Sequence, residues 1–193
     1  MHLRVFVNKN KMDLPSTGFV AVMDRRGLGD FLTLPLLENL ASSSPDTLKI
    51  LVSPIESCRN RFRSIRDLMV FEEYKPTIPE AILIRQRRYG AERKACLILE
   101  DCIYDDGGIW DSNIRELVAN CHALNVLIVL CMQYPLTLPG PFEMMYISKK
   151  TTSVRRRCYD LYAKDVYPNY DAFATALDVN EYLVIKTIAK SSE

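Results

Sequence analysis

The sequence predicts a three-layer α/β domain with a mainly parallel central sheet, and three observations lead to this fold class. Short apolar runs alternate with longer helix-like segments along the chain. Runs such as VLIVLCM are continuously apolar, as in strands that helices cover on both faces. The chain has 193 residues, 48% of them hydrophobic, which suits a single domain with a sizeable core.

The individual elements follow from the lengths of these segments. Six apolar runs are expected to form strands, at residues 19–23, 48–53, 95–99, 126–132, 143–147 and 182–185. Six longer segments are expected to form helices, at residues 29–42, 56–69, 78–89, 112–124, 152–163 and 170–177. The first of these helices contains Pro35, which removes a backbone hydrogen bond and favours a kink.

Composition limits the classes of function. The net charge is +1, so any attraction to nucleic acid or anionic membrane must come from local clusters. The six cysteines include no CxxC pair and several lie in apolar runs, which indicates buried thiols in a reducing compartment, without disulfides or zinc. No run approaches transmembrane length, so we expect no membrane insertion. The two histidines are too isolated to indicate a metal site or a histidine-based mechanism.

The segment after the first expected strand, MDRRGLGDF at residues 23–31, has the layout of a phosphate-binding loop. A working loop, GxxxxGK[ST], wraps phosphates with backbone N–H groups and needs a lysine for the phosphates and a hydroxyl for Mg²⁺. Here Gly29 matches the second glycine, but Asp24 replaces the first one. Asp30 replaces the lysine, and Phe31 replaces the hydroxyl residue. The rest of this candidate degenerate nucleotide-binding loop is Arg25, Arg26 and Gly27.

The charge at Asp30 argues against tight binding of ATP through this loop. Replacing an ammonium by a carboxylate about 4 Å from one phosphate charge changes the interaction energy by roughly 8 kcal/mol at an effective dielectric near 20. Micromolar binding is worth only about 8 kcal/mol in total. Arg25 and Arg26 can restore part of the positive charge, whereas Phe31 offers no oxygen to Mg²⁺.

Polar residues follow two of the expected strands. Glu100 and Asp101 end the run CLILED, and in phosphoryl-transfer ATPases such acids hold the Mg²⁺ shell and polarise the attacking water. The alternative is a buried strand that simply leaves the core on acidic residues. Gln133 follows VLIVLCM, where it can orient a water or sense a terminal phosphate, or only mark the start of a loop.

Three basic clusters have more than one interpretation. Arg155, Arg156 and Arg157 open a helix-like segment, where arginines can reach across a subunit interface to stabilise transferred phosphate charge. They can equally contact a nucleic-acid backbone or form a solvated basic face. The same alternatives apply to the sets Arg59, Arg61, Arg63 and Arg66, and Arg85, Arg87 and Arg88.

The order of segments over residues 95–188 gives a more specific indication. LILEDCIYDD is followed by a long strand ending in MQYPL, by the arginine- and tyrosine-rich segment TTSVRRRCYDLYA, and by YPNYDAF. This arrangement resembles the genome-packaging ATPases of large nucleocytoplasmic DNA viruses, the poxvirus-type branch of the FtsK/HerA group of P-loop motors. The N-terminal half fits the same plan more loosely. The resemblance implies a P-loop NTPase-like fold over a single domain, residues 1–193.

The resemblance also implies roles for particular residues. It places Glu100 and Asp101 at the acidic pair, with Glu100 as the Mg²⁺ ligand, and Gln133 at the polar sensor. It places Arg155 and Arg157 in the basic helix that supplies a trans-acting finger. It further implies a homo- or hetero-oligomeric ring that uses Mg-ATP to move double-stranded DNA, located in the host cytoplasm, the viral factory or the virion.

The chain departs from this family at the phosphate loop, and three hypotheses follow. We favour a degenerate homologue that kept the fold, lost tight nucleotide binding and acts as a structural or regulatory partner in packaging, because the strands persist while the phosphate-contacting residues do not. The alternative is an active ATP-driven motor subunit with an unconventional loop. A third hypothesis is an unrelated α/β binding module in which the motifs are accidental.

Overall fold

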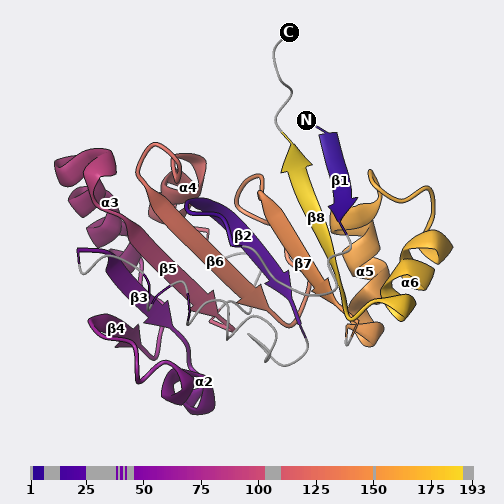
Figure 1. Cartoon of the computed structure of the whole chain (residues 1–193), viewed down its shortest axis with the longest axis horizontal. Coiled ribbons are helices and arrows are strands. Elements are labelled where there is room, and N and C mark those ends of the chain that lie inside the picture. Colours follow the sequence, from indigo (N-terminus) through magenta and orange to yellow (C-terminus); the bar gives the residue numbers. More distant parts are fainter. Residues whose placement is uncertain are drawn as a thin grey trace, which may run out of the picture.

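A computed structural model describes residues 2–6, 14–24, 38, 40, 42, 46–102, 110–149 and 151–188. The strands of these segments form one sheet in the order β1-β8-β7-β2-β6-β5-β3-β4 (Figure 1). Their bounds are β1 His2–Phe6, β2 Gly18–Met23, β3 Leu48–Val52, β4 Leu68–Phe71, β5 Ala95–Glu100, β6 Val126–Met132, β7 Met144–Ser148 and β8 Tyr182–Ile188.

The sheet is mainly parallel, as the sequence predicted. The strands from β7 to β4 pair in parallel along the sheet order. Only the edge beyond β7 differs among the described strands, because β8 runs antiparallel to β7 and β1 antiparallel to β8. Since β5, β6 and β2 are parallel neighbours, the chain leaves all of them at the same edge of the sheet.

Helices cover both faces, which completes the predicted three layers. α2 (Glu56–Arg61) packs on one face through Cys58, and Phe62 and Ile65 beyond its end pack there too. The other face is covered by α3 (Thr77–Tyr89), α4 (Ser112–Ala119), α5 (Arg155–Cys158), the π-helix η3 (Tyr159–Ala163) and α6 (Tyr170–Val179). Figure 1 shows α3 at the β3–β5 end of the sheet, α4 near β6, and α5 and α6 at the β7–β8 end.

Burial on both faces explains the continuous apolar runs. In β2, the side chains of Phe19, Ala21 and Met23 belong to one core cluster, and those of Val20 and Val22 to the other. Every residue of β2, β5 and β6 is buried. Alternate residues of a strand point to opposite faces, so a strand between two helical layers needs apolar side chains throughout.

The helix predicted at residues 56–69 is wrong in its second half. α2 ends at Arg61, and β4 occupies Leu68–Phe71 as an edge strand parallel to β3. Asp67 has a φ of 59°, a left-handed conformation that interrupts a helix and directs the chain into β4. Strand β1 was not predicted either.

Two other predicted helices differ in detail. The helix at residues 112–124 ends earlier, at Ala119, and Asn125 with a φ of 53° turns the chain into β6. The segment 152–163 is helical but irregular, with the 3-10 turn η2 (Thr152–Val154), then α5 and then η3. The 3-10 turn η1 (Gly90–Glu92) follows α3. The predicted helix at 29–42 lies outside the described residues except for Glu38, Leu40 and Ser42, where Ser42 N donates to Glu38 O at 3.0 Å.

Gly18 at the start of β2 provides a test of backbone strain in this fold. Its φ is 118°, and a Cβ there would lie 2.4 Å from Cδ of Glu143. That carboxylate contacts Nε2 of His122, whose Nδ1 lies 3.0 Å from Thr17 Oγ1. Gly18→Ala should therefore destabilise the fold by more than the about 1–3 kcal/mol of backbone strain alone, as measured by urea unfolding.

Gly90→Ala is the matched control for this prediction. Gly90 also has a positive φ, 61°, but a Cβ there would meet nothing within 4 Å. Both substitutions strain the backbone, and only Gly18→Ala adds a collision with a held side chain. An equal or larger loss of stability in Gly90→Ala would contradict the proposed role of the Glu143 contact.

Candidate functional site at the carboxyl edge of the sheet

The polar residues predicted from the strand ends lie on three adjacent strands. Asp24 follows β2, Glu100 is the last residue of β5, and Gln133 follows β6. Backbone hydrogen bonds hold the chain in register beyond the strands, because Asp24 N donates to Met132 O at 3.1 Å and Asp101 N donates to Cys131 O at 3.1 Å. The side chains therefore emerge at one edge, where open α/β sheets collect their ligands.

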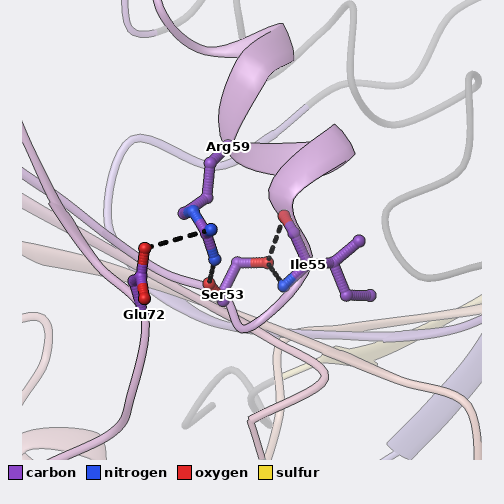
Figure 2. A network of polar contacts seen from close by, with 4 residues as sticks. All are labelled: Ser53, Ile55, Arg59 and Glu72. Carbon is purple, nitrogen blue, oxygen red and sulfur yellow. Dashed lines mark hydrogen bonds and ion pairs between the residues drawn. The ribbon is translucent and has the colours of Figure 1, made fainter.

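Glu100 is buried and hydrogen-bonded. Its side chain is 2% exposed, and its Oε2 accepts a hydrogen bond of 2.7 Å from the hydroxyl of Ser53, which follows β3. The Ser53 Oγ also accepts from Ile55 N at 3.1 Å (Figure 2). The Ser53 hydroxyl therefore connects the turn before α2 to the Glu100 carboxylate and fixes the position of that carboxylate. The role of Ser53 was not predicted, because nothing in the local sequence links it to a residue 47 positions away.

Arg59 supports the same turn. Its Nη1 donates to Ser53 O at 2.9 Å, and its Nη2 lies 3.1 Å from Oε1 of Glu72, which follows β4 (Figure 2). Only 18% of the Arg59 side chain is exposed. The arginine therefore joins α2 to the ends of β3 and β4, which favours the structural interpretation of this member of its basic cluster.

Asp101 and Gln133 are brought together at the edge. The Asp101 side chain is 4% exposed, and its Oδ2 accepts a hydrogen bond from Gln133 Nε2. Burial raises the pKa of the Asp101 carboxyl, the negative charge of Glu100 adds to the rise, and the hydrogen bond from Gln133 opposes it. The φ of Asp101 is 45°, a conformation that aspartate and asparagine tolerate better than most residues.

Two buried thiols lie beside these acids. Burial raises the pKa of Cys58 far above its usual range, and a hydrogen bond to Glu100 adds to the effect. The pKa of Cys131 is raised by burial and by the charge of Glu100. The raised pKa values favour the protonated, less reactive form of both thiols at neutral pH.

The net result is an acidic, enclosed edge. Asp24 is completely buried, like the two acids that end β5, so carboxylates occupy the ends of both β2 and β5. Within the segments that the structure covers, no group of three or more His, Cys, Asp or Glu residues is placed to hold a metal ion. The candidate loop residues Arg25, Arg26, Gly27, Gly29, Asp30 and Phe31 lie outside the described residues.

Among the described residues, Arg155 and Arg156 of the basic helix contact residues of α6 and η3, and not the residues of the carboxyl edge. Arg155 is 11% exposed, and its Nη1 lies 2.9 Å from Oδ1 of Asp178 in α6, a partner that sequence analysis did not identify. Arg156 lies over the ring of Tyr170, with its Cζ 5.1 Å from the ring centroid, and pairs with Asp160 at 3.3 Å. Arg157 is exposed on α5.

A second basic feature surrounds Tyr89 at the end of α3. The Cζ atoms of Arg85, Arg88 and Arg93 lie 5.8, 5.5 and 4.4 Å from the centroid of its ring. The predicted cluster thus gains Arg93, and the ring offsets part of the repulsion among the guanidinium groups.

The protein is a three-layer α/β domain with buried acidic residues at the carboxyl edge of its sheet. This architecture is compatible with a P-loop-like domain. Comparisons of the chain with protein-family models, with curated proteins and with solved structures find no match. Within the described ranges, the helices are too short or too polar to span a bilayer.

The raised pKa of Asp101 gives a prediction about stability and pH. A carboxyl whose pKa is higher in the folded state stabilises the fold while protonated, and this contribution is lost as pH rises through the folded-state pKa. Asp101→Asn removes the buried charge and keeps an acceptor for Gln133. The advantage of the variant in free energy of unfolding should therefore grow as pH rises above about 4, the ordinary pKa of an aspartate.

Denaturant unfolding at a series of pH values measures this difference. Asp171→Asn is the control, since Asp171 is an exposed carboxylate in the first turn of α6. This variant should show no gain in stability as pH rises, because its side chain is not buried. If Asp101→Asn shows no such gain either, burial of the Asp101 charge does not limit stability.

Proposed function

We propose that this chain is a degenerate homologue of viral genome-packaging ATPases, with weak or no ATP hydrolysis, which serves as a structural or regulatory partner in genome packaging. The observation that carries the proposal is the buried carboxylate of Asp24, directly after β2. In a working phosphate loop this position holds a glycine, whose backbone approaches the phosphates closely. The Asp24 carboxylate would repel a phosphate group, whereas the backbone N–H groups of a working loop attract it.

The sequence of the loop supports the same conclusion. Asp30 and Phe31 stand where a working loop has its lysine and its Mg²⁺-binding hydroxyl. Two of the three chemical contributions to triphosphate binding are thus replaced, and the third, the backbone cradle, would have to form beside the Asp24 carboxylate.

The contacts of the acidic pair also favour a scaffold. Glu100, the candidate Mg²⁺ ligand, accepts the Ser53 hydroxyl, and Asp101 accepts the Gln133 amide. These hydrogen bonds order the edge without any nucleotide, and a buried carboxylate that kept no donor would destabilise the fold. Selection for a stable fold alone can therefore maintain the acids.

The role as a partner follows from the resemblance to ring-forming motors. Arg155 and Arg157 are the candidates for reaching the nucleotide of a neighbouring subunit; Arg157 is exposed on α5, and Arg155 pairs with Asp178 within its own chain. A homo- or hetero-oligomeric ring, contact with double-stranded DNA and a location in the host cytoplasm, the viral factory or the virion belong to this proposal.

Isothermal titration of the purified chain with Mg-ATP tests the proposal. We expect no measurable heat of binding, because the loop offers carboxylates where phosphates require cations. The variant Asp30→Lys with Phe31→Ser restores both missing groups and should bind Mg-ATP more tightly than the unmodified chain. Sub-millimolar affinity of the unmodified chain would contradict the proposal.

The alternative is an active motor subunit, favoured by the meeting of Glu100, Asp101 and Gln133 at one edge. A catalytic acid and a polar sensor on neighbouring strands are the arrangement that activation of water requires. If the chain is such a motor, phosphate release in the presence of Mg-ATP and double-stranded DNA should fall by a factor of about 100 or more in Glu100→Gln with Asp101→Asn. Turnover that persists in this variant would assign the acids a purely structural role.

A further inference from the structure

A pocket of about 250 Å³ lies on the face of the sheet that carries α4 and α6. One wall is the connection between β6 and β7, with Leu136, Leu138 and Phe142. The opposite wall is formed by Leu161 and Tyr162 of η3. None of the candidate nucleotide-site residues lines it, so it is a separate feature of the molecule.

The wall formed by η3 has an unusual backbone. Lys164 N donates to Tyr159 O at 2.9 Å, a bond across five residues that defines a π-helical turn. Such turns are rare and are found frequently at functional sites. The π-helical turn places Leu161 and Tyr162 in the wall of the pocket, which makes this wall a candidate functional feature.

Tyr162 fixes the two walls relative to each other. Its hydroxyl donates to Leu136 O at 2.5 Å and accepts from Leu136 N at 2.9 Å. Its ring stands edge-on to Phe142, with centroids 6.5 Å apart and an interplanar angle of 87°. The pocket is therefore preformed, and a ligand would not have to order its walls on binding.

The charge at the rim identifies the ligand class. Asp165 is the only carboxylate among the lining residues and is exposed, and among the described residues no cationic side chain pairs with it. Leu161 beside it is 39% exposed, a large apolar side chain turned toward solvent. A carboxylate that lines the same pocket as two aromatic rings and an exposed aliphatic group complements a cation carried on an apolar body.

We propose that this pocket binds a small organic cation, an ammonium, amidinium or guanidinium group on a compact apolar body. Asp165 is the counter-ion, and Phe142, Tyr162 and Leu161 contact the apolar part. The volume lies just below the range of about 300–1,000 Å³ of typical ligand sites, which limits the occupant to about one ring or one side chain. The proposal is independent of the function proposed above.

Titration of the purified chain with benzamidine and with benzamide tests the proposal. The two compounds have nearly the same shape, and only benzamidine is charged. Amide chemical shifts should change saturably at residues 136–142 and 161–165, and benzamidine should bind at least about tenfold more tightly, as expected for a charge-assisted contact. Equal affinities, or shifts confined to other parts of the chain, would overturn the proposal.

Asp165→Asn separates charge from shape. The position is exposed, so the variant should fold, and its unchanged remaining spectrum would show this. It should weaken benzamidine about tenfold and leave benzamide unaffected, whereas the control Asp171→Asn on α6 should change neither. Leu161→Ala should weaken both compounds, because it removes apolar contact. Unaltered benzamidine binding in Asp165→Asn would show that the carboxylate does not recognise the cation.

A blocked arginine, N-acetylarginine N-methylamide, distinguishes two sources of such a cation. If it binds the unmodified chain and not Asp165→Asn, an arginine side chain of a partner protein fits the pocket. If benzamidine alone binds, the occupant is a free aromatic cation. If neither compound binds at millimolar concentration, the pocket is not a cation site.

Discussion

Burial of β2, β5 and β6 on both faces determines where this protein can place polar side chains. A charge in the middle of any of these strands would lie between two apolar clusters and would cost several kcal/mol. Polar groups are therefore confined to strand ends, and parallel neighbours end at the same edge. The convergence of Asp24, Glu100 and Gln133 is a consequence of topology before it is a consequence of function.

The donors at this edge explain how buried acids are tolerated there. Ser53 neutralises part of the cost of burying Glu100, and Gln133 does the same for Asp101. Each such hydrogen bond to a charged group contributes about 1.5–3 kcal/mol net. The charge of Glu100 still raises the pKa of Asp101, so the two neighbouring acids repel each other when both are charged. An anionic ligand would add to this charge, whereas a proton or a cation would reduce it.

The sequence predicts the core of this fold well, because a strand that is buried on both faces must be continuously apolar over a short length. It fails where a local pattern fits two structures. The four-residue strand β4 lies at a sheet edge, where Met69 and Val70 are exposed, so its pattern does not differ from that of a helix end. The π-turn is hidden for a similar reason, since Cys158 and Tyr162 fall on one face with either helical period.

Partners that are distant in the sequence account for most of the site that could not be predicted. Glu100, Asp101 and Gln133 were found because strand ends are visible in the sequence. Ser53 and Asp178 were not, because their contacts with Glu100 and Arg155 depend on the position of α2 and α6 in three dimensions. Hydrogen-bond donors to a buried acid leave no local signal when they come from another strand.

The position of the pocket follows from the prolines in the connection between β6 and β7. Parallel strands are usually joined by a helical crossover that covers the sheet. Between β6 and β7 the chain contains Pro135, Pro139 and Pro141, and closely spaced prolines exclude a helix because each removes an N–H donor. The connection therefore crosses without a helix, and Gly140 lets it approach α4 closely, since a Cβ there would lie 3.1 Å from Val118 Cγ1. The pocket lies between this non-helical connection and η3.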